Sequence, residues 1–179
     1  LGFLPSAVIG ALAYKLIKAM LDAPAVVAWA LILGGIAILV IEKMAKTIRT
    51  ESVEGMNWRT ALGIGFIQCL SMIPGVSRSG ATIMGALMLG VERKTAAEFS
   101  FFVAVPTMIG ATSLALYKEG AALAAADISN IAIGFVISFI VAAIVIKGFL
   151  AVVTRYGFAP FAWYRILIGI VALIWLNTP

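Results

Sequence analysis

The stretch Pro74-Gly75-Val76-Ser77-Arg78-Ser79-Gly80-Ala81-Thr82 decides the fold, because it places an arginine, three hydroxyls and two glycines inside an otherwise apolar region. Between residues 61 and 91, Arg78 is the only side chain that is charged at neutral pH. Leaving an unpaired guanidinium at membrane depth costs several kcal/mol even on lenient scales. The stretch therefore predicts an anionic partner beside Arg78.

The composition sets a membrane around this stretch. The chain has 179 residues, of which 63% are hydrophobic and 12% are charged, and its mean hydropathy is +1.13. Its apolar runs recur at about the 20-residue length that a helix needs to cross a bilayer. We therefore predict an integral membrane protein. The polar segment 42–59 carries both signs of charge, which argues against a nucleic-acid partner.

The apolar runs predict five membrane spans, and the region around Arg78 differs from all of them. Pro74, Gly75 and Gly80 interrupt it, because proline removes a backbone donor and glycine permits non-helical backbone. Irregular backbone at membrane depth persists only where protein buries it or a polar cavity borders it. We expect two half-helices, about 61–73 and 80–91, in a re-entrant hairpin; one kinked helix is the alternative. The spans are expected at about 1–21, 26–41, 99–116, 128–149 and 161–176.

A weak internal repeat extends this prediction to the architecture. Leu4-Pro5 and Val105-Pro106 begin similar patterns roughly a hundred residues apart, and Trp58-Arg59 resembles Trp163-Tyr164-Arg165. Such a period is typical of inverted-topology repeats, which place binding sites at the repeat interface; chance similarity of apolar helices is the alternative. The predicted fold class is an all-α integral membrane protein. It is a polytopic helical bundle with a re-entrant helix-loop-helix hairpin, and it forms the second half of an inverted-repeat architecture. Residues 1–179 would form one transmembrane domain, the C-terminal part of a longer protein.

Basic residues predict the orientation. By the positive-inside rule, the face richer in lysine and arginine is cytoplasmic, which places segment 42–59 inside and Pro179 outside. The richer face is expected to hold Lys43, Lys46, Arg49, Arg59, Arg93, Lys94, Lys147 and Arg155, and the opposite face Lys15, Lys18 and Lys118.

The loop chemistry favours a phosphate. A half-helix that begins near Ser79 or Gly80 would point free N–H groups and its positive dipole end at an anion. Arginine adds paired donors that match a phosphate and stays charged at low dielectric. The alternative is that Ser79 only caps the half-helix and Arg78 pairs with a carboxylate or snorkels. The candidate anion-binding residues are Arg78, Ser77, Ser79, Thr82, Gly75 and Gly80.

PGVSRSGAT also carries a resemblance to a known family. Together with Gln68-Cys69-Leu70 before it, and segments 97–101 and 104–106 after it, the motif resembles the second signature of the undecaprenyl-pyrophosphate phosphatases of the bacitracin-resistance type. The likeness covers essentially the whole chain. It implies a bacterial inner-membrane hydrolase that removes the terminal phosphate of the C55 isoprenyl pyrophosphate, which recycles the lipid carrier of peptidoglycan synthesis. It further implies that Arg78 binds the pyrophosphate, with Ser77, Ser79 and Thr82 as neighbouring donors, in a site that opens to the outer side.

The chain departs from that family in one respect. The family's earlier signature, a Glu/Gln-x-x-x-Glu run and a Ser-rich loop ending in Gly-His, is absent, and the sequence contains no histidine. Gln68 stands where a repeat would echo the first acidic residue, whereas Met72 occupies the place of the second. By resemblance, a divalent cation (Mg or Ca) would take part, with its ligands outside this chain. We therefore expect the chain alone to be inactive.

Several alternatives remain open from the sequence. Ser77 or Ser79 is a candidate nucleophile, although no base is near in sequence and binding roles are favoured; Gln68 joins the substrate-binding candidates. Glu98 belongs to Thr95-Ala96-Ala97-Glu98, which predicts a capping box more readily than a metal ligand. A transporter or flippase for an anionic lipid or small anion also uses inverted repeats and broken helices. A homodimer is left open.

Overall fold

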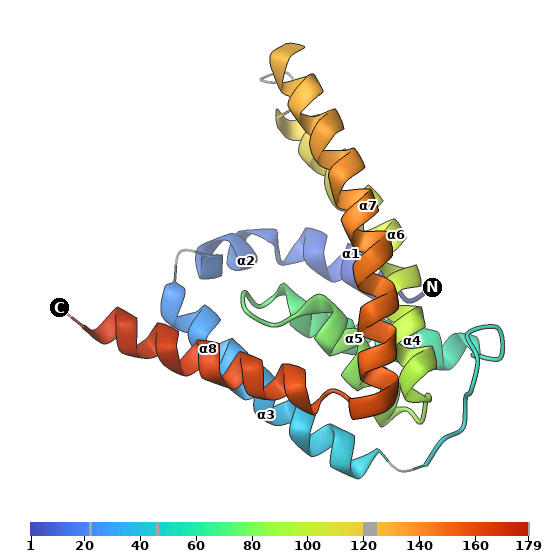
Figure 1. Cartoon of the computed structure of the whole chain (residues 1–179). Coiled ribbons are helices and arrows are strands. Elements are labelled where there is room, and N and C mark those ends of the chain that lie inside the picture. Colours follow the sequence, from blue (N-terminus) through green and yellow to red (C-terminus); the bar gives the residue numbers. More distant parts are fainter. Residues whose placement is uncertain (22, 46, 120–124, 179) are drawn as a thin grey trace.

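The computed structural model describes residues 1–21, 23–45, 47–119 and 125–178. Within these ranges the chain is helical apart from connecting segments and one isolated bridge between Thr50 and Val91. Four helices, α3, α6, α7 and α8, are long and apolar enough to cross a membrane. The protein is thus an all-α polytopic membrane protein, as predicted. In order, the helices are α1 (Leu4–Leu12), α2 (Tyr14–Leu21), α3 (Pro24–Met44), α4 (Trp58–Gln68), the 3-10 helix η1 (Cys69–Met72), α5 (Arg78–Met88), α6 (Arg93–Glu119), α7 (Ala125–Tyr156) and α8 (Ala159–Asn177) (Figure 1).

The N-terminal segment differs from the expected single span over 1–21. It forms two helices of nine and eight residues, α1 and α2, which are separated at Ala13. The sequence offers a physical reason, because α1 has no charged residue whereas α2 carries Lys15 and Lys18 within eight residues. Neither helix alone is long enough to cross the hydrocarbon region of a bilayer. By contrast, α3, α6, α7 and α8 all extend beyond the predicted spans at both ends.

Helices α3 and α8 pack closely along one another and form the base of the molecule in Figure 1. Glycines permit this approach: a Cβ atom at Gly35 would lie 2.8 Å from the carbonyl oxygen of Ala162, and one at Gly169 would lie 2.8 Å from that of Ala28. Small residues at such contacts let helix backbones approach in membrane proteins. The pair therefore supplies a rigid support beneath the central hairpin α4–α5.

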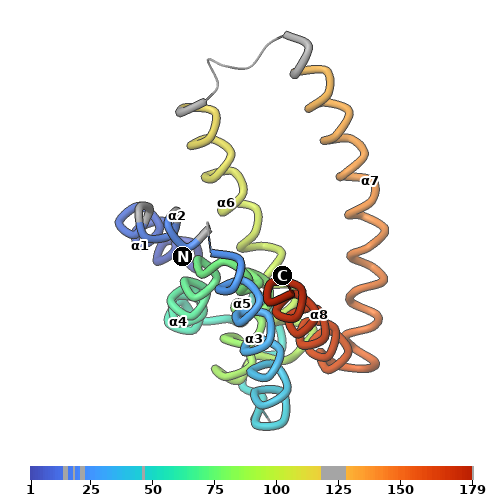
Figure 2. The backbone as a smooth tube through the Cα atoms, turned by 90° about the vertical axis from the view of Figure 1, so that its left-hand side faces the viewer, coloured from blue at the N-terminus to red at the C-terminus, as the bar shows by residue number. Residues whose placement is uncertain are grey.

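Helices α6 and α7 project away from this body, as both views show (Figures 1 and 2). They meet near the body through an edge-on contact of Phe101 with Phe149, whose ring centroids are 5.9 Å apart. Farther along, Figure 2 shows the two helices spread apart. Most of α7 is exposed, whereas Val153 near its end is fully buried.

Three chain segments meet at one end of the molecule, around Glu42 near the end of α3. Its Oε1 atom accepts a hydrogen bond from the backbone N–H of Phe158 (2.9 Å) and lies 3.1 Å from Nε of Arg93. Arg49 donates its backbone N–H to Gly90 at the same end (2.7 Å). This end carries several of the basic residues expected on the cytoplasmic face, while the orientation itself stays a prediction. Lys46 and Pro179 lie outside the described residues, as do the side chains of Lys15, Lys18 and Lys118.

The capping box predicted at Thr95 is wrong in its position. Helix α6 begins at Arg93, three residues before the start that an N-cap at Thr95 implies, and the backbone N–H of Ala96 bonds to the carbonyl of Glu92 (2.8 Å). The Thr95 hydroxyl instead lies 2.7 Å from the Glu51 carbonyl, which it satisfies as a donor. Glu98 pairs with Lys94 at 3.8 Å. The cause is that Glu92 supplies the first helical carbonyl, so Thr95 already lies within the helix.

Candidate functional site

The central hairpin consists of two helices joined by an irregular loop at residues 73–77. Asn57 caps α4 by accepting the N–H of Thr60 (2.8 Å), and η1 continues α4 until the backbone becomes extended at Ile73. Helix α5 begins at Arg78, earlier than the predicted Ser79 or Gly80, because the Ser77 hydroxyl oxygen accepts the N–H of Gly80 (3.1 Å). Its first turn still leaves backbone N–H groups without helical partners, which is the basis of an anion site.

Gly75 fixes the shape of the loop. Its φ of +91° lies in the left-handed region, which glycine adopts without strain. A Cβ atom there would also lie 2.5 Å from the carbonyl oxygen of Val27 in α3. The loop therefore rests directly on α3 at Gly75, while its role in substrate binding stays a prediction.

The three side chains at the start of α5 do not converge on one point. Arg78 borders a cavity of about 570 Å³ between α1, η1 and α6. Ser77 borders a second cavity, toward α3 and α8, and Ser79 a third, toward α6 and α7. Successive helical residues differ by about 100° in direction, so this divergence follows from the early helix start. The two serine hydroxyls still contact each other at 3.1 Å.

Arg78 is a half-buried cation that pairs with no carboxylate among the residues that the structure describes. Its Nη1 atom donates to the backbone carbonyl of Ser100 in α6 at 2.8 Å, which fixes the guanidinium at the cavity wall. Across the described part of the chain, the ion pairs are Arg93 with Glu42 and Lys94 with Glu98. Because one carbonyl uses only one of five N–H donors, the remaining donors of Arg78 are available to an anion.

A buried polar chain lies beside Arg78. The Thr82 hydroxyl lies 2.9 Å from Oε1 of Gln68 and 2.8 Å from the Arg78 carbonyl, and Nε2 of Gln68 donates to the hydroxyl of Ser6 at 2.7 Å. Gln68 and Thr82 are 1% and 0% exposed. Gln68 and Ser6 border the Arg78 cavity, together with Ser71, Met72 and Thr107. Thr82 thus holds Gln68 in place and does not face the cavity itself.

Two polar residues of this region were missed by the sequence interpretation. Ser6 of α1 carried no signal, because a single serine in an apolar helix is common. Arg165 carried one, since it is the only charged residue of the apolar helix α8, and a charge in such a helix requires a partner. In the structure Nη2 of Arg165 donates to the carbonyl of Gly75 at 3.0 Å and lies 3.4 Å from that of Ala30.

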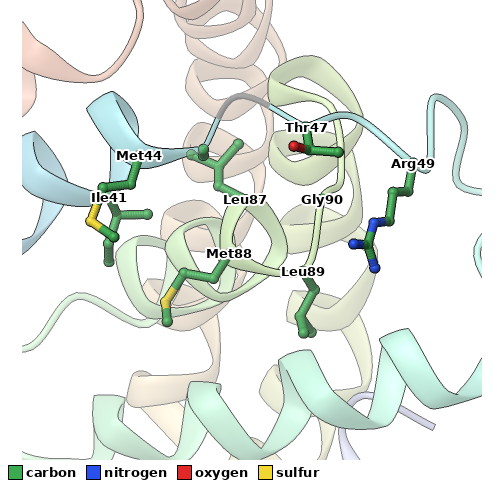
Figure 3. Close-up of a pocket in the computed structure, with 9 residues that line it drawn as sticks. Ile41, Met44, Thr47, Arg49, Leu87, Met88, Leu89 and Gly90 are labelled. Atoms are coloured by element: carbon green, nitrogen blue, oxygen red, sulfur yellow. The ribbon is translucent and has the colours of Figure 1, made fainter.

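A further cavity of about 420 Å³ lies at the other end of α5, and its lining includes Thr47, Arg49, Leu87, Met88 and Leu89 (Figure 3). Helix α5 has 11 residues, and at 1.5 Å per residue this cavity is roughly 16 Å from Ser77. It is therefore separate from the hairpin loop.

The residues around Arg78 do not fit a divalent cation by themselves. Mg²⁺ and Ca²⁺ prefer carboxylate and carbonyl oxygens, whereas the polar lining here consists of hydroxyls, one amide and the guanidinium. Among the described residues, no three His, Cys, Asp or Glu side chains are grouped so as to hold a metal. The arrangement is suited to an anion.

The chain is similar to known proteins over nearly its whole length. The family model described as "Bacitracin resistance protein BacA" matches residues 1–171. Curated relatives include the undecaprenyl-diphosphatases of Rhizorhabdus wittichii (70% identical over 98% of this chain) and Sphingopyxis alaskensis (61% over 98%). The chain spans 66% of the length of each of these two relatives. The undecaprenyl-diphosphatase of Wolinella succinogenes is 50% identical over 98% of the chain and 69% of its own length.

Proposed function

Because the chain belongs to the bacitracin resistance protein BacA family, we propose that the protein containing it is an undecaprenyl-diphosphate phosphatase. It would hydrolyse the phosphoanhydride of the C55 isoprenyl pyrophosphate to the monophosphate and phosphate. This would recycle the carrier lipid for cell-wall synthesis and confer bacitracin resistance. The observation that carries the proposal is Arg78, a cation without a carboxylate partner in the described chain, held against a largely apolar cavity.

The geometry supports a division of roles among the binding residues. The Ser100 carbonyl orients the Arg78 guanidinium, whose remaining N–H groups donate to phosphate oxygens, as forked donors do well. Ser6 accepts a hydrogen bond from Gln68 and borders the same cavity, so its hydroxyl lies on the side from which the anion would enter. The apolar walls, which include Phe3 and Leu114, suit the first isoprene units of a lipid. Thr82 positions Gln68, while Ser77, Ser79 and Gly80 belong to the start of α5.

Hydrolysis needs more than this chain supplies. Phosphoryl transfer requires stabilisation of charge on the transferred group and a base that prepares the nucleophile. Neither a carboxylate nor an imidazole borders the Arg78 cavity in the described structure. We propose that the base, and the carboxylates that hold Mg or Ca, come from the part of the protein outside this chain. The Ser77 oxygen accepts the cap hydrogen bond, which favours a binding or positioning role over a nucleophilic one.

The cellular setting is also part of the proposal. A multi-pass membrane protein of this family would lie in the bacterial inner membrane, with the Arg78 cavity open to the outer side where the spent carrier is released. A homodimer stays an expectation from the sequence alone.

The test is phosphate release by the full-length protein, purified in detergent and given undecaprenyl diphosphate. We expect equal amounts of phosphate and undecaprenyl phosphate. A protein that binds the lipid but releases no phosphate, with or without Mg²⁺ or Ca²⁺, would instead support the transporter or flippase alternative. Residues 1–179 purified alone form the matched control, and we expect no turnover from them. Comparable turnover by the short chain would place the base inside it and contradict the division of roles.

A further inference from the structure

We infer that Arg165 is a positioning residue for the anion-binding hairpin: from α8 it holds the loop before Arg78 against α3, and so sets the direction of the first turn of α5. The inference rests on the proposed function for its effect on turnover. Arg165 is the only charged residue of α8, a helix of 19 residues whose other side chains are almost all apolar. Such a residue at membrane depth needs partners that stabilise its charge.

Those partners are backbone carbonyls of two segments that are far apart in the sequence. Nη2 of Arg165 donates to the Gly75 carbonyl at 3.0 Å and lies 3.4 Å from the Ala30 carbonyl of α3. Gly75 belongs to the irregular loop, so its carbonyl has no regular helical donor. Hydrogen bonds from a charged donor are roughly twice as strong as neutral ones. One nitrogen therefore joins the loop to α3, at the point where Gly75 already touches Val27.

Two glycines make the slot that this guanidinium occupies. A Cβ atom at Gly34 would lie 2.5 Å from Nη2 of Arg165 and 3.1 Å from its Cζ. A Cβ atom at Gly80, in the first turn of α5, would lie 3.2 Å from Nη1. The guanidinium thus fits between α3 and the start of α5 because both positions lack a side chain. Gly34 offers a way to displace the guanidinium without removing its charge.

Arg165 acts on the Arg78 cavity through the loop, since it borders a different cavity. That cavity, of about 240 Å³, is lined by Ser77, Gly80 and apolar residues of α3 and α5, whereas Arg78 faces α1 and α6. Arg78 therefore extends from the start of α5 toward α1 and α6, whereas Arg165 approaches the same turn from α8. Displacing the loop would move the N–H groups of the first turn and the backbone that carries Arg78.

The experiment compares variants of the full-length protein by kinetics of phosphate release from undecaprenyl diphosphate. For Arg165→Gln we expect kcat to fall about 10- to 100-fold, because misplacement of a binding group by about 1 Å has an effect of this size in other enzymes. KM should change less than about threefold, because Arg165 does not border the Arg78 cavity. Arg165→Lys should recover part of the loss, since an ammonium can still donate to one carbonyl. Gly34→Ala should reproduce the loss. The controls are Arg155→Gln, at an exposed arginine, and Gly148→Ala, where a Cβ meets nothing within 4 Å.

A second measurement follows the exposure of the loop and does not depend on enzyme activity. Val76→Cys in a Cys69→Ser background reports loop exposure through its rate of maleimide labelling in detergent. Arg165→Gln should raise that rate several-fold, whereas Arg155→Gln should not. Wild-type kcat or unchanged labelling in Arg165→Gln protein that elutes as one symmetrical peak would overturn the inference. If Arg165→Gln does not fold, Arg165→Lys and Gly34→Ala decide by the same criteria. Absence of phosphate release by the wild type would refute the proposed function. The labelling rate would still test whether Arg165 positions the loop.

Discussion

Replacing Thr82 by valine should destabilise the hairpin, because it removes one hydroxyl from a fully buried site and keeps the shape of the side chain. The hydroxyl lies 2.9 Å from Oε1 of Gln68 and 2.8 Å from the Arg78 carbonyl. In the variant, the Arg78 carbonyl keeps a helical N–H partner in α5. The Oε1 atom of Gln68, a residue that is 1% exposed, loses the hydrogen-bond donor that Thr82 supplies. Leaving a buried acceptor unpaired costs about 1–3 kcal/mol, and side-chain hydrogen bonds inside membranes average about 0.6 kcal/mol with a maximum near 1.7.

We therefore expect a loss of about 1–2 kcal/mol for Thr82→Val. At about 2–4 °C per kcal/mol for a protein of this size, Tm should fall by about 2–8 °C. The assay is thermal unfolding of the full-length protein in detergent, followed by circular dichroism. Thr154→Val is the matched control, because the Thr154 hydroxyl is exposed and bonds to the Leu150 carbonyl of its own helix. Equal Tm values for the two variants would refute the role assigned to the Gln68–Thr82 contact.

Two further predictions concern stability and orientation. Glu42→Ala should lower Tm more than Glu42→Gln, because glutamine still accepts the Phe158 N–H. Alanine leaves both that N–H and Arg93 without a partner, and an unpaired buried group costs about 1–3 kcal/mol. Glu54→Gln, at an exposed position, is the control, and equal changes in Tm for all three variants would contradict the role of Glu42. A cysteine at Ser52 in a Cys69→Ser background should react with an impermeant thiol reagent only after the cytoplasmic side is opened, and labelling from outside in intact cells would reverse the predicted orientation.

The sequence predicted the helical membrane fold and the family, both of which are confirmed. The Pro74–Gly75 pair also predicted the break in the hairpin, because proline removes a backbone donor and the adjacent glycine permits a left-handed backbone. The prediction of a single span over 1–21 was wrong because it treated the apolar run as one helix, although the second half of the run carries two lysines. The prediction at Thr95 was wrong because the capping-box motif begins about one helical turn after the observed start of α6.

The arrangement of the site was less accessible from the sequence. Ser77 and Ser79 both qualify as caps, and the choice between them rotates the first turn and decides which cavity each side chain borders. The partners of Arg165 are backbone carbonyls 90 and 135 residues away. Every residue has a backbone carbonyl, so the sequence does not indicate which ones are partners. The internal repeat, the cation and the homodimer stay predictions.

The most direct test of the central claim, that Arg78 binds the diphosphate, is the turnover of undecaprenyl diphosphate by full-length Arg78→Lys beside Arg59→Lys. Lysine keeps the charge but loses the paired donors and the fixed contact with the Ser100 carbonyl, whereas Arg59 is exposed on α4 and stacks over Trp58. Arg78→Lys should lose most of kcat/KM, at about tenfold for each 1.4 kcal/mol of lost transition-state binding, and Arg59→Lys should keep wild-type kinetics. Near-normal phosphate release by a folded Arg78→Lys protein would contradict the claim.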